Sequence, residues 1–166
     1  AGILYDLGAH VIDQAIALFG SPDDFLKSYS KNRKATEVDD YAQVQLKYKE
    51  GLNVFITTNM LVADAPPAYS IYGTNGTFYK GRTDVQEEQL LADVKPLDSH
   101  YGLEVQGSEG KLTLISEDGI KKEQFIEAKK GDYMLLFDEV YNAIRKGSDY
   151  FVSQKEILTQ LHVLEK

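Results

Sequence analysis

Two stretches of alternating residues, joined by only three residues, restrict the fold of this chain more than any other feature. Residues 41–48, YAQVQLKY, alternate strictly, and residues 52–61, LNVFITTNML, return after the turn KEG. Such alternation predicts strands with one buried face. A three-residue connection is too short for a helical crossover, so the two strands must pair antiparallel. The predicted buried side of the first strand carries Ala42, Val44, Leu46 and Tyr48.

Short strands joined by short turns recur along the chain, and helical patterns lie at both of its ends. Further strands are predicted at residues 25–30, 69–73, 76–80, 111–115 and 120–127. Helices are predicted at residues 2–19, 132–147 and 153–166, the last opening with Ser153 and Glu156 at the spacing of a capping box. This order predicts an α+β fold, in which an open, mostly antiparallel β-sheet has helices packed on one face.

The predicted helix at residues 2–19 carries a polar stripe. At about 100° per residue, and with Asp6 as the origin, His10 lies near 40° and Asp13 near −20°. A histidine beside carboxylates can transfer protons near neutral pH, and this spacing lets all three side chains contact one small polar ligand. A helix whose solvent side happens to carry these residues is the alternative. The apolar side is predicted to hold Leu4, Leu7, Val11, Ala15 and Leu18.

Composition excludes several other kinds of site. The 166 residues include no cysteine, which excludes disulfides and cysteine-based zinc sites and fits a cytoplasmic protein. A net charge of −8 argues against nucleic-acid binding, and no apolar run approaches the roughly 20 residues of a membrane span. A single histidine beside two acids lacks the second histidine of H-E-x-x-H, so no metal site is predicted. The glycines of GTNG and GSEG lack the spacing of a nucleotide-binding loop and are expected in turns.

Three further regions leave alternatives open. Residues 81–109 are polar and irregular, which is typical of a long and often functional excursion, and His100 within it could line a pocket. His162 is expected to be a partly buried or surface residue of the last helix. The second face of the strand at 41–48 suits either solvent or another subunit. That face carries Tyr41, Gln43, Gln45 and Lys47.

The segment AGILYDLGAHVIDQAIALFGSPDDF resembles the start of the C-terminal domain in the glucose-fructose oxidoreductase / inositol dehydrogenase / rhizopine catabolism family. The family pattern G-x-L-x-D-x-G-x-H-x-x-D is matched by Gly2, Leu4, Asp6, Gly8, His10 and Asp13. The turn G-T-x-G, the motifs F-x-K and D-x-Q-E within residues 73–87, and the helix at 132–147 extend the resemblance over essentially the whole chain. The subgroup that it resembles most contains scyllo-inositol dehydrogenases.

The resemblance implies that residues 1–166 are a single substrate-binding and dimerisation domain, the C-terminal part of a two-domain dehydrogenase. It implies a parent enzyme that uses NAD or NADP to oxidise a hydroxyl of a sugar or cyclitol, or the reverse. His10 would be the proton-transferring acid/base, Asp6 its catalytic partner and Asp13 a contact to a substrate hydroxyl. It also implies a homo-oligomer formed through the open sheet face.

The chain departs from the family pattern in what it lacks. The N-terminal Rossmann domain and its E-K-P segment, whose lysine completes the family's catalytic group, are absent from this sequence. We therefore expect this fragment alone to be inactive and to bind no cofactor. A non-catalytic carbohydrate-binding or assembly module on the same fold is the alternative. An anionic substrate would need basic residues, for which Arg33, Lys80 and Arg82 are the candidates.

Overall fold

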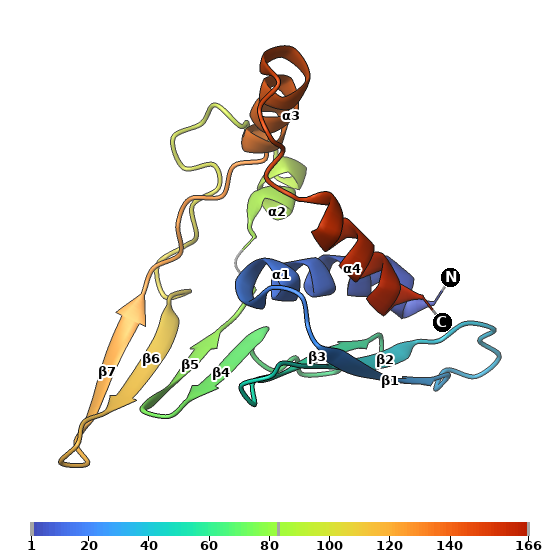
Figure 1. Cartoon of the computed structure of the whole chain (residues 1–166). Coiled ribbons are helices and arrows are strands. Elements are labelled where there is room, and N and C mark those ends of the chain that lie inside the picture. Colours follow the sequence, from blue (N-terminus) through green and yellow to red (C-terminus); the bar gives the residue numbers. More distant parts are fainter. Residues whose placement is uncertain (1, 83, 166) are drawn as a thin grey trace. The chain divides into compact units, whose positions relative to one another are not determined.

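The computed structural model describes residues 2–82 and 84–165, which form two compact units. One unit comprises Ala1–Ala63 with Asp149–Lys166, and the other comprises Asp64–Ser148. Every strand pair in the described residues is antiparallel, which confirms the α+β class. The strands are divided between a three-stranded sheet in the first unit and a four-stranded sheet in the second (Figure 1).

In the first unit, helices cover one face of the three-stranded sheet (Figure 1). The unit contains η1 (Leu4–Gly8), α1 (Ala9–Phe19), β1 (Asp24–Ser30), β2 (Tyr41–Lys47), β3 (Asn53–Asn59) and α4 (Gln154–Leu164). The strand order is β1-β2-β3. Ala42, Val44 and Leu46 of β2 are buried as the alternation predicted, and they pack with residues of α1 and α4. Burying side chains of this kind stabilises a fold by about 1.5–3 kcal/mol each.

Two polar contacts fix α4 in this unit. The capping box predicted at its start is present, since the Ser153 hydroxyl accepts from the Glu156 N–H and the Glu156 carboxylate accepts from the Ser153 N–H. At its other end, the Lys27 ammonium of β1 donates to the carbonyls of Val163 and Glu165. A cation at a helix C-terminus is favourable because the last carbonyls carry partial negative charge.

The helix predicted at residues 2–19 is present, but its first turn is not α-helical. Residues Leu4–Gly8 form a π-helical turn, in which each N–H bonds one residue further back than in an α-helix. The buried side of α1 holds Ile12, Ala15 and Ile16, whereas Leu7 and Leu18 are 41% and 64% exposed. Apolar residues occupy more than one side of this helix, so contact with the sheet, and not periodicity alone, selects the buried side.

The second unit is built on two β-hairpins that were both predicted. It contains β4 (Tyr69–Gly73), β5 (Gly76–Lys80), α2 (Gln86–Leu91), β6 (Gly110–Ile115), β7 (Lys121–Ile126) and α3 (Met134–Lys146). The strands pair in the order β4-β5-β6-β7. The short helix α2 lies inside the excursion at residues 81–109, whose sequence pattern predicts irregular structure.

One glutamine of α2 holds the excursion together. The Gln89 side chain donates to the carbonyls of His100 and Leu103, at 3.3 and 3.2 Å, and accepts from the Gly102 N–H at 2.7 Å. The adjacent Tyr101 is one of the largest fully buried side chains in the chain. Among residues 86–103, hydrogen bonds within the segment therefore satisfy several polar backbone groups.

Replacing Gly102 with alanine is expected to reduce the free energy of unfolding by about 2–5 kcal/mol. Gly102 has a φ of +74°, and a Cβ there would lie 2.0 Å from the Gly131 carbonyl oxygen. Gly107→Ala is the matched control, because its φ is +93° and nothing lies within 4 Å of a Cβ. We expect that variant to lose only about 1–2 kcal/mol, the cost of the left-handed backbone. Equal losses for the two variants in urea unfolding would contradict the steric argument.

Candidate functional site

The three residues singled out from the sequence lie on one continuous helical segment of the first unit. Asp6 belongs to the π-turn η1, and His10 and Asp13 belong to α1. All three side chains are exposed. Among residues 2–82 and 84–165, no side-chain hydrogen bond or ion pair engages them, so their polar atoms are available to a ligand. The structure therefore places the predicted polar stripe on the solvent side of the helix.

The glycine and leucine positions of the family pattern are structural. A Cβ at Gly8 would lie 2.5 Å from the Leu4 Cδ1 atom, and one at Gly2 would lie 3.1 Å from the Asp39 Cβ atom. Leu4 itself is buried in the core of the unit. Because a larger residue would be crowded at either position, the two glycines allow the chain to form its π-turn. A π-helical turn is often found at functional sites. The pattern thus combines packing residues with exposed acidic and histidine residues.

Contacts on both sides of the turn hold the backbone that carries His10. The Ile3 N–H donates to the Asp39 carbonyl at 2.9 Å. The Gln160 side chain of α4 donates to the Ala9 carbonyl at 2.6 Å, one residue before His10. A catalytic or binding side chain requires this kind of support, because small displacements of the reacting group are costly.

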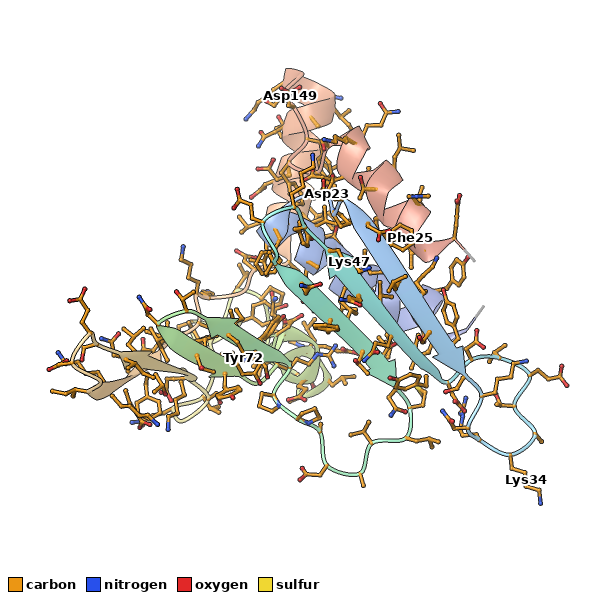
Figure 2. The ribbon with its side chains drawn as sticks, turned by 60° about the horizontal axis from the view of Figure 1, so that its bottom comes forward. Asp23, Phe25, Lys34, Lys47, Tyr72 and Asp149 are labelled. Atoms are coloured by element: carbon orange, nitrogen blue, oxygen red, sulfur yellow. The ribbon has the colours of Figure 1, made fainter. Side chains whose placement is uncertain are left out.

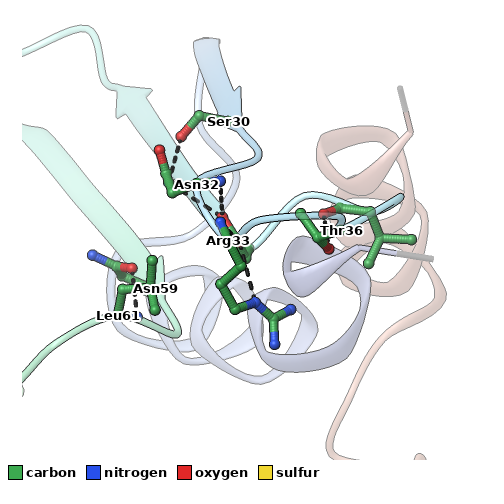
Figure 3. Close-up of polar contacts among 8 residues, drawn as sticks. Ser30, Asn32, Arg33, Thr36, Asn59 and Leu61 are labelled. Carbon is green, nitrogen blue, oxygen red and sulfur yellow. Dashed lines mark hydrogen bonds and ion pairs between the residues drawn. The ribbon is translucent and has the colours of Figure 1, made fainter.

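Arg33, one of the basic candidates, is engaged within the fold (Figure 3). The buried Asp40 carboxylate accepts from the backbone N–H groups of Asn32 and Arg33, both at 2.8 Å, and from the Arg33 guanidinium at 3.2 Å. Burial raises the pKa of Asp40, but these hydrogen bonds and the guanidinium charge outweigh it and hold the pKa below its ordinary value. Asp40 thereby closes the loop between β1 and β2.

The depressed pKa of Asp40 predicts how stability depends on pH. The carboxylate contributes stability above its ordinary, unfolded pKa of 3.8, and that contribution is lost as the pH falls through the lower folded pKa. We expect Asp40→Asn to be less stable than the wild type at pH 7 and to approach it as the pH is lowered below about 4. Urea unfolding at several pH values measures this difference. Glu37→Gln, in an exposed residue of the same loop, should follow the wild type; a constant gap for Asp40→Asn would contradict the assignment.

Lys80, another basic candidate, is buried in the second unit. Its ammonium lies 2.8 Å from both oxygens of the Glu104 carboxylate and also donates to the Ser108 carbonyl. The side chains of Lys80 and Glu104 are only 5% and 10% exposed. This lysine of the F-x-K motif therefore pairs with an internal acid. Arg82, the third candidate, is exposed.

The D-x-Q-E motif forms a second network, whose roles sequence reasoning missed. The Tyr133 hydroxyl donates to the Asp84 carboxylate at 2.5 Å, and the Tyr133 N–H donates to the Gln86 side chain at 2.8 Å. The hydrogen bond to Asp84, with burial and nearby negative charge, raises the pKa of Tyr133 to about 12. The D-x-Q-E motif is the signal of this network in the sequence. Tyr133, the partner of Gln86, lies 47 residues away from it.

The other two histidines lie apart from such networks. His100 is exposed, and its backbone carbonyl accepts from the Gln89 side chain and from the Leu103 N–H. His162 packs edge-on against Phe25 at 5.2 Å between ring centroids, and it lines an open depression on α4. Among the described residues, neither histidine side chain forms a hydrogen bond or ion pair with Asp6 or Asp13.

The residues of this chain do not fit NAD or NADP by themselves. A dinucleotide site needs a parallel strand, a glycine-rich turn and a helix, whereas every strand pair in the described residues is antiparallel. Within the described part of the chain, no group of three or more histidine, cysteine or acidic residues could hold a metal ion. No described helix is long and apolar enough to cross a membrane.

Comparisons with known proteins agree with this architecture. The model of the oxidoreductase family, C-terminal alpha/beta domain, matches residues 1–166. A crystal structure of an oxidoreductase from Bacillus cereus matches 99% of this chain at a TM-score of 0.91 and 32% identity, and the match covers 48% of that chain. The fold is thus that of an oxidoreductase C-terminal domain. The chain belongs to the glucose-fructose oxidoreductase / inositol dehydrogenase / rhizopine catabolism family, which confirms the resemblance drawn from its sequence.

Two curated relatives are similar along nearly the whole chain. The uncharacterized oxidoreductase YhhX of Escherichia coli is 32% identical over 165 residues, which are 99% of this chain and 47% of that protein. The scyllo-inositol 2-dehydrogenase (NADP(+)) IolW of Bacillus subtilis is 33% identical over 164 residues, which are 99% of this chain and 45% of that protein. The chain therefore spans about half the length of these relatives.

Proposed function

We propose that this chain is the substrate-binding and oligomerisation domain of an NAD(P)-dependent oxidoreductase that acts on a hydroxyl of a sugar or cyclitol in the cytoplasm. The observation that carries the proposal is the exposed stripe of Asp6, His10 and Asp13 on a helical segment whose backbone is held on both sides. The similarity to a scyllo-inositol 2-dehydrogenase supports the substrate class. The absence of cysteine fits the proposed compartment.

The chemistry assigned to the stripe follows from what an alcohol must lose. Oxidation to a ketone removes the hydroxyl proton, which a ring nitrogen of His10 accepts. The Asp6 carboxylate stabilises the resulting imidazolium, and Asp13 accepts a hydrogen bond from a neighbouring hydroxyl. In the reverse direction, His10 returns the proton to the carbonyl oxygen. The hydride that leaves the carbon requires an acceptor that the residues of this chain do not hold.

The experiment is a turnover assay of the full-length protein and of residues 1–166 alone on a panel of polyols, with NAD and with NADP. We expect the full-length protein to turn over a polyol and the fragment to be inactive, because the fragment has no hydride acceptor. Turnover by the fragment would overturn the division of the site. Saturable polyol binding by the full-length protein without any turnover would support the non-catalytic carbohydrate-binding module instead.

We propose that oligomerisation uses the sheet face of the first unit that lies opposite α1 and α4 (Figure 2). Across the three strands, Leu26, Gln45 and Phe55 form one row, in which Leu26 and Phe55 are 55% and 62% exposed. The Gln45 amide in the middle of this row donates to the Asn53 side chain at 2.9 Å. Sedimentation of the full-length protein measures the assembly; a monomer at micromolar concentration would reject it.

A further inference from the structure

Helix α3 has no buried residue, although its sequence is strongly amphipathic. The apolar residues from Tyr133 to Ile144 are between 40% and 74% exposed. They are Tyr133, Met134, Leu135, Leu136, Phe137, Val140, Tyr141 and Ile144. Within its own unit, α3 makes no extended contact with another described helix or strand. A helix of 13 residues is only marginally stable without packing, so this helix requires a partner surface.

The shape of its apolar face indicates the kind of partner. At about 100° per residue, the apolar arc runs from Leu136 to Met134 and is roughly 160° wide. Leu135 lies on the opposite side, between Asn142 and Lys146. An arc this wide is typical of a helix that packs on a globular surface, because a coiled-coil seam is narrower. The partner therefore presents a broad apolar surface, which a single helix from a second copy would not provide.

The base of α3 is firmly attached. Gln86 and Asp84 bind the backbone and the hydroxyl of Tyr133 at the N-terminus of the helix, as described above. The Gly131 N–H also donates to the Gly102 carbonyl at 2.8 Å. The D-x-Q-E motif thus fixes one end of α3 and leaves its apolar face uncovered by the rest of its unit. A contiguous exposed apolar surface, such as the arc from Leu136 to Met134, marks an interaction site.

We propose that the apolar face of α3 docks onto the N-terminal half of the same polypeptide. The matched relatives are about twice as long as this chain, and the matching family model is a C-terminal domain. In the proposed oligomer a second copy occupies the sheet face of the first unit, which leaves α3 to the rest of its own polypeptide. The inference rests on the proposed two-domain parent and adds the surface through which its halves meet.

Hydrogen exchange of the full-length protein tests the docking. We expect the α3 amides to be protected equally at low and high protein concentration, and to exchange at least about 10-fold faster in Phe137→Asp, since a buried charge opposes docking. Asn142→Asp adds the same charge on the opposite side of α3 and should leave protection unchanged. Phe137→Ala is the milder variant should the charged one fail to fold, and it should show a smaller increase in the same amides.

Three results would overturn the docking. They are unprotected α3 amides in the full-length protein, protection that rises with protein concentration, and equal protection in residues 1–166 alone. The second would assign the face to another copy, and the third to this chain itself. The polyol assay is read separately. Turnover of a polyol with unprotected α3 amides rejects the docking but keeps the proposed function. Protected α3 amides without turnover keep the docking but reject the proposed function.

Discussion

Replacing His10 with alanine in the full-length protein is expected to lower kcat by about 10²–10⁴-fold, the usual contribution of general acid–base catalysis. The loss follows from removing the group that accepts the hydroxyl proton. The fold should tolerate the change, because the His10 side chain is exposed and forms no hydrogen bond or ion pair with a described residue. We expect the free energy of unfolding to change by less than about 0.5 kcal/mol. Steady-state kinetics on the substrate found in the polyol panel, together with urea unfolding, separate the two effects.

His162→Ala is the matched control for this prediction. His162 is also an exposed histidine on a helix of the first unit, but it lies on α4 and packs against Phe25. Its removal should leave kcat within about twofold of the wild type, since it is not part of the stripe. A His10→Ala enzyme with full kcat would show that another group moves the proton. Equal losses for both histidines would show that the effect is not specific to the stripe.

The largest expected effect on stability comes from removing Glu104. In Glu104→Leu the buried Lys80 ammonium loses its paired carboxylate and keeps the Ser108 carbonyl and an electrostatic interaction with the Glu109 carboxylate. Breaking one partner out of a buried ion pair costs about 3–5 kcal/mol, because the remaining charge is uncompensated in a low-dielectric environment. Urea unfolding of the second unit, followed through its tyrosines, measures this loss.

Two further variants separate the buried charge from other effects. The double variant Lys80→Met with Glu104→Leu should regain most of the lost stability, since apolar residues can replace a buried pair. Glu123→Ala breaks the Lys111–Glu123 pair in the same unit, whose side chains are about half exposed. It should cost less than about 1 kcal/mol, as surface pairs do. A Glu104→Leu variant no less stable than Glu123→Ala would contradict the account.

Local patterns predicted much of this molecule because the forces behind them are local. Strand alternation placed Ala42, Val44 and Leu46 on the buried side, and turns of two to four residues set the hairpin partners. The capping box at Ser153 and the polar stripe through His10 also depend on residues within one or two helical turns. In each case the interacting groups are close in sequence, so their spacing is sufficient to predict the contact.

Contacts between distant residues were not predictable in this way. In the sequence Lys80 is only a basic candidate for an anionic substrate, whereas its partner Glu104 lies 24 residues away. Gln86 likewise binds Tyr133 across 47 residues. The division into two sheets and the π-turn before His10 also had no sequence signal.

The sequence by itself determined the antiparallel hairpins, the helical segments and the residue types on the polar stripe, because periodicity and turn chemistry act between near neighbours. Only the tertiary structure decided which charges are buried and paired and which apolar faces remain uncovered. Desolvation depends on everything that surrounds a group, and that environment exists only once segments distant in sequence have packed together.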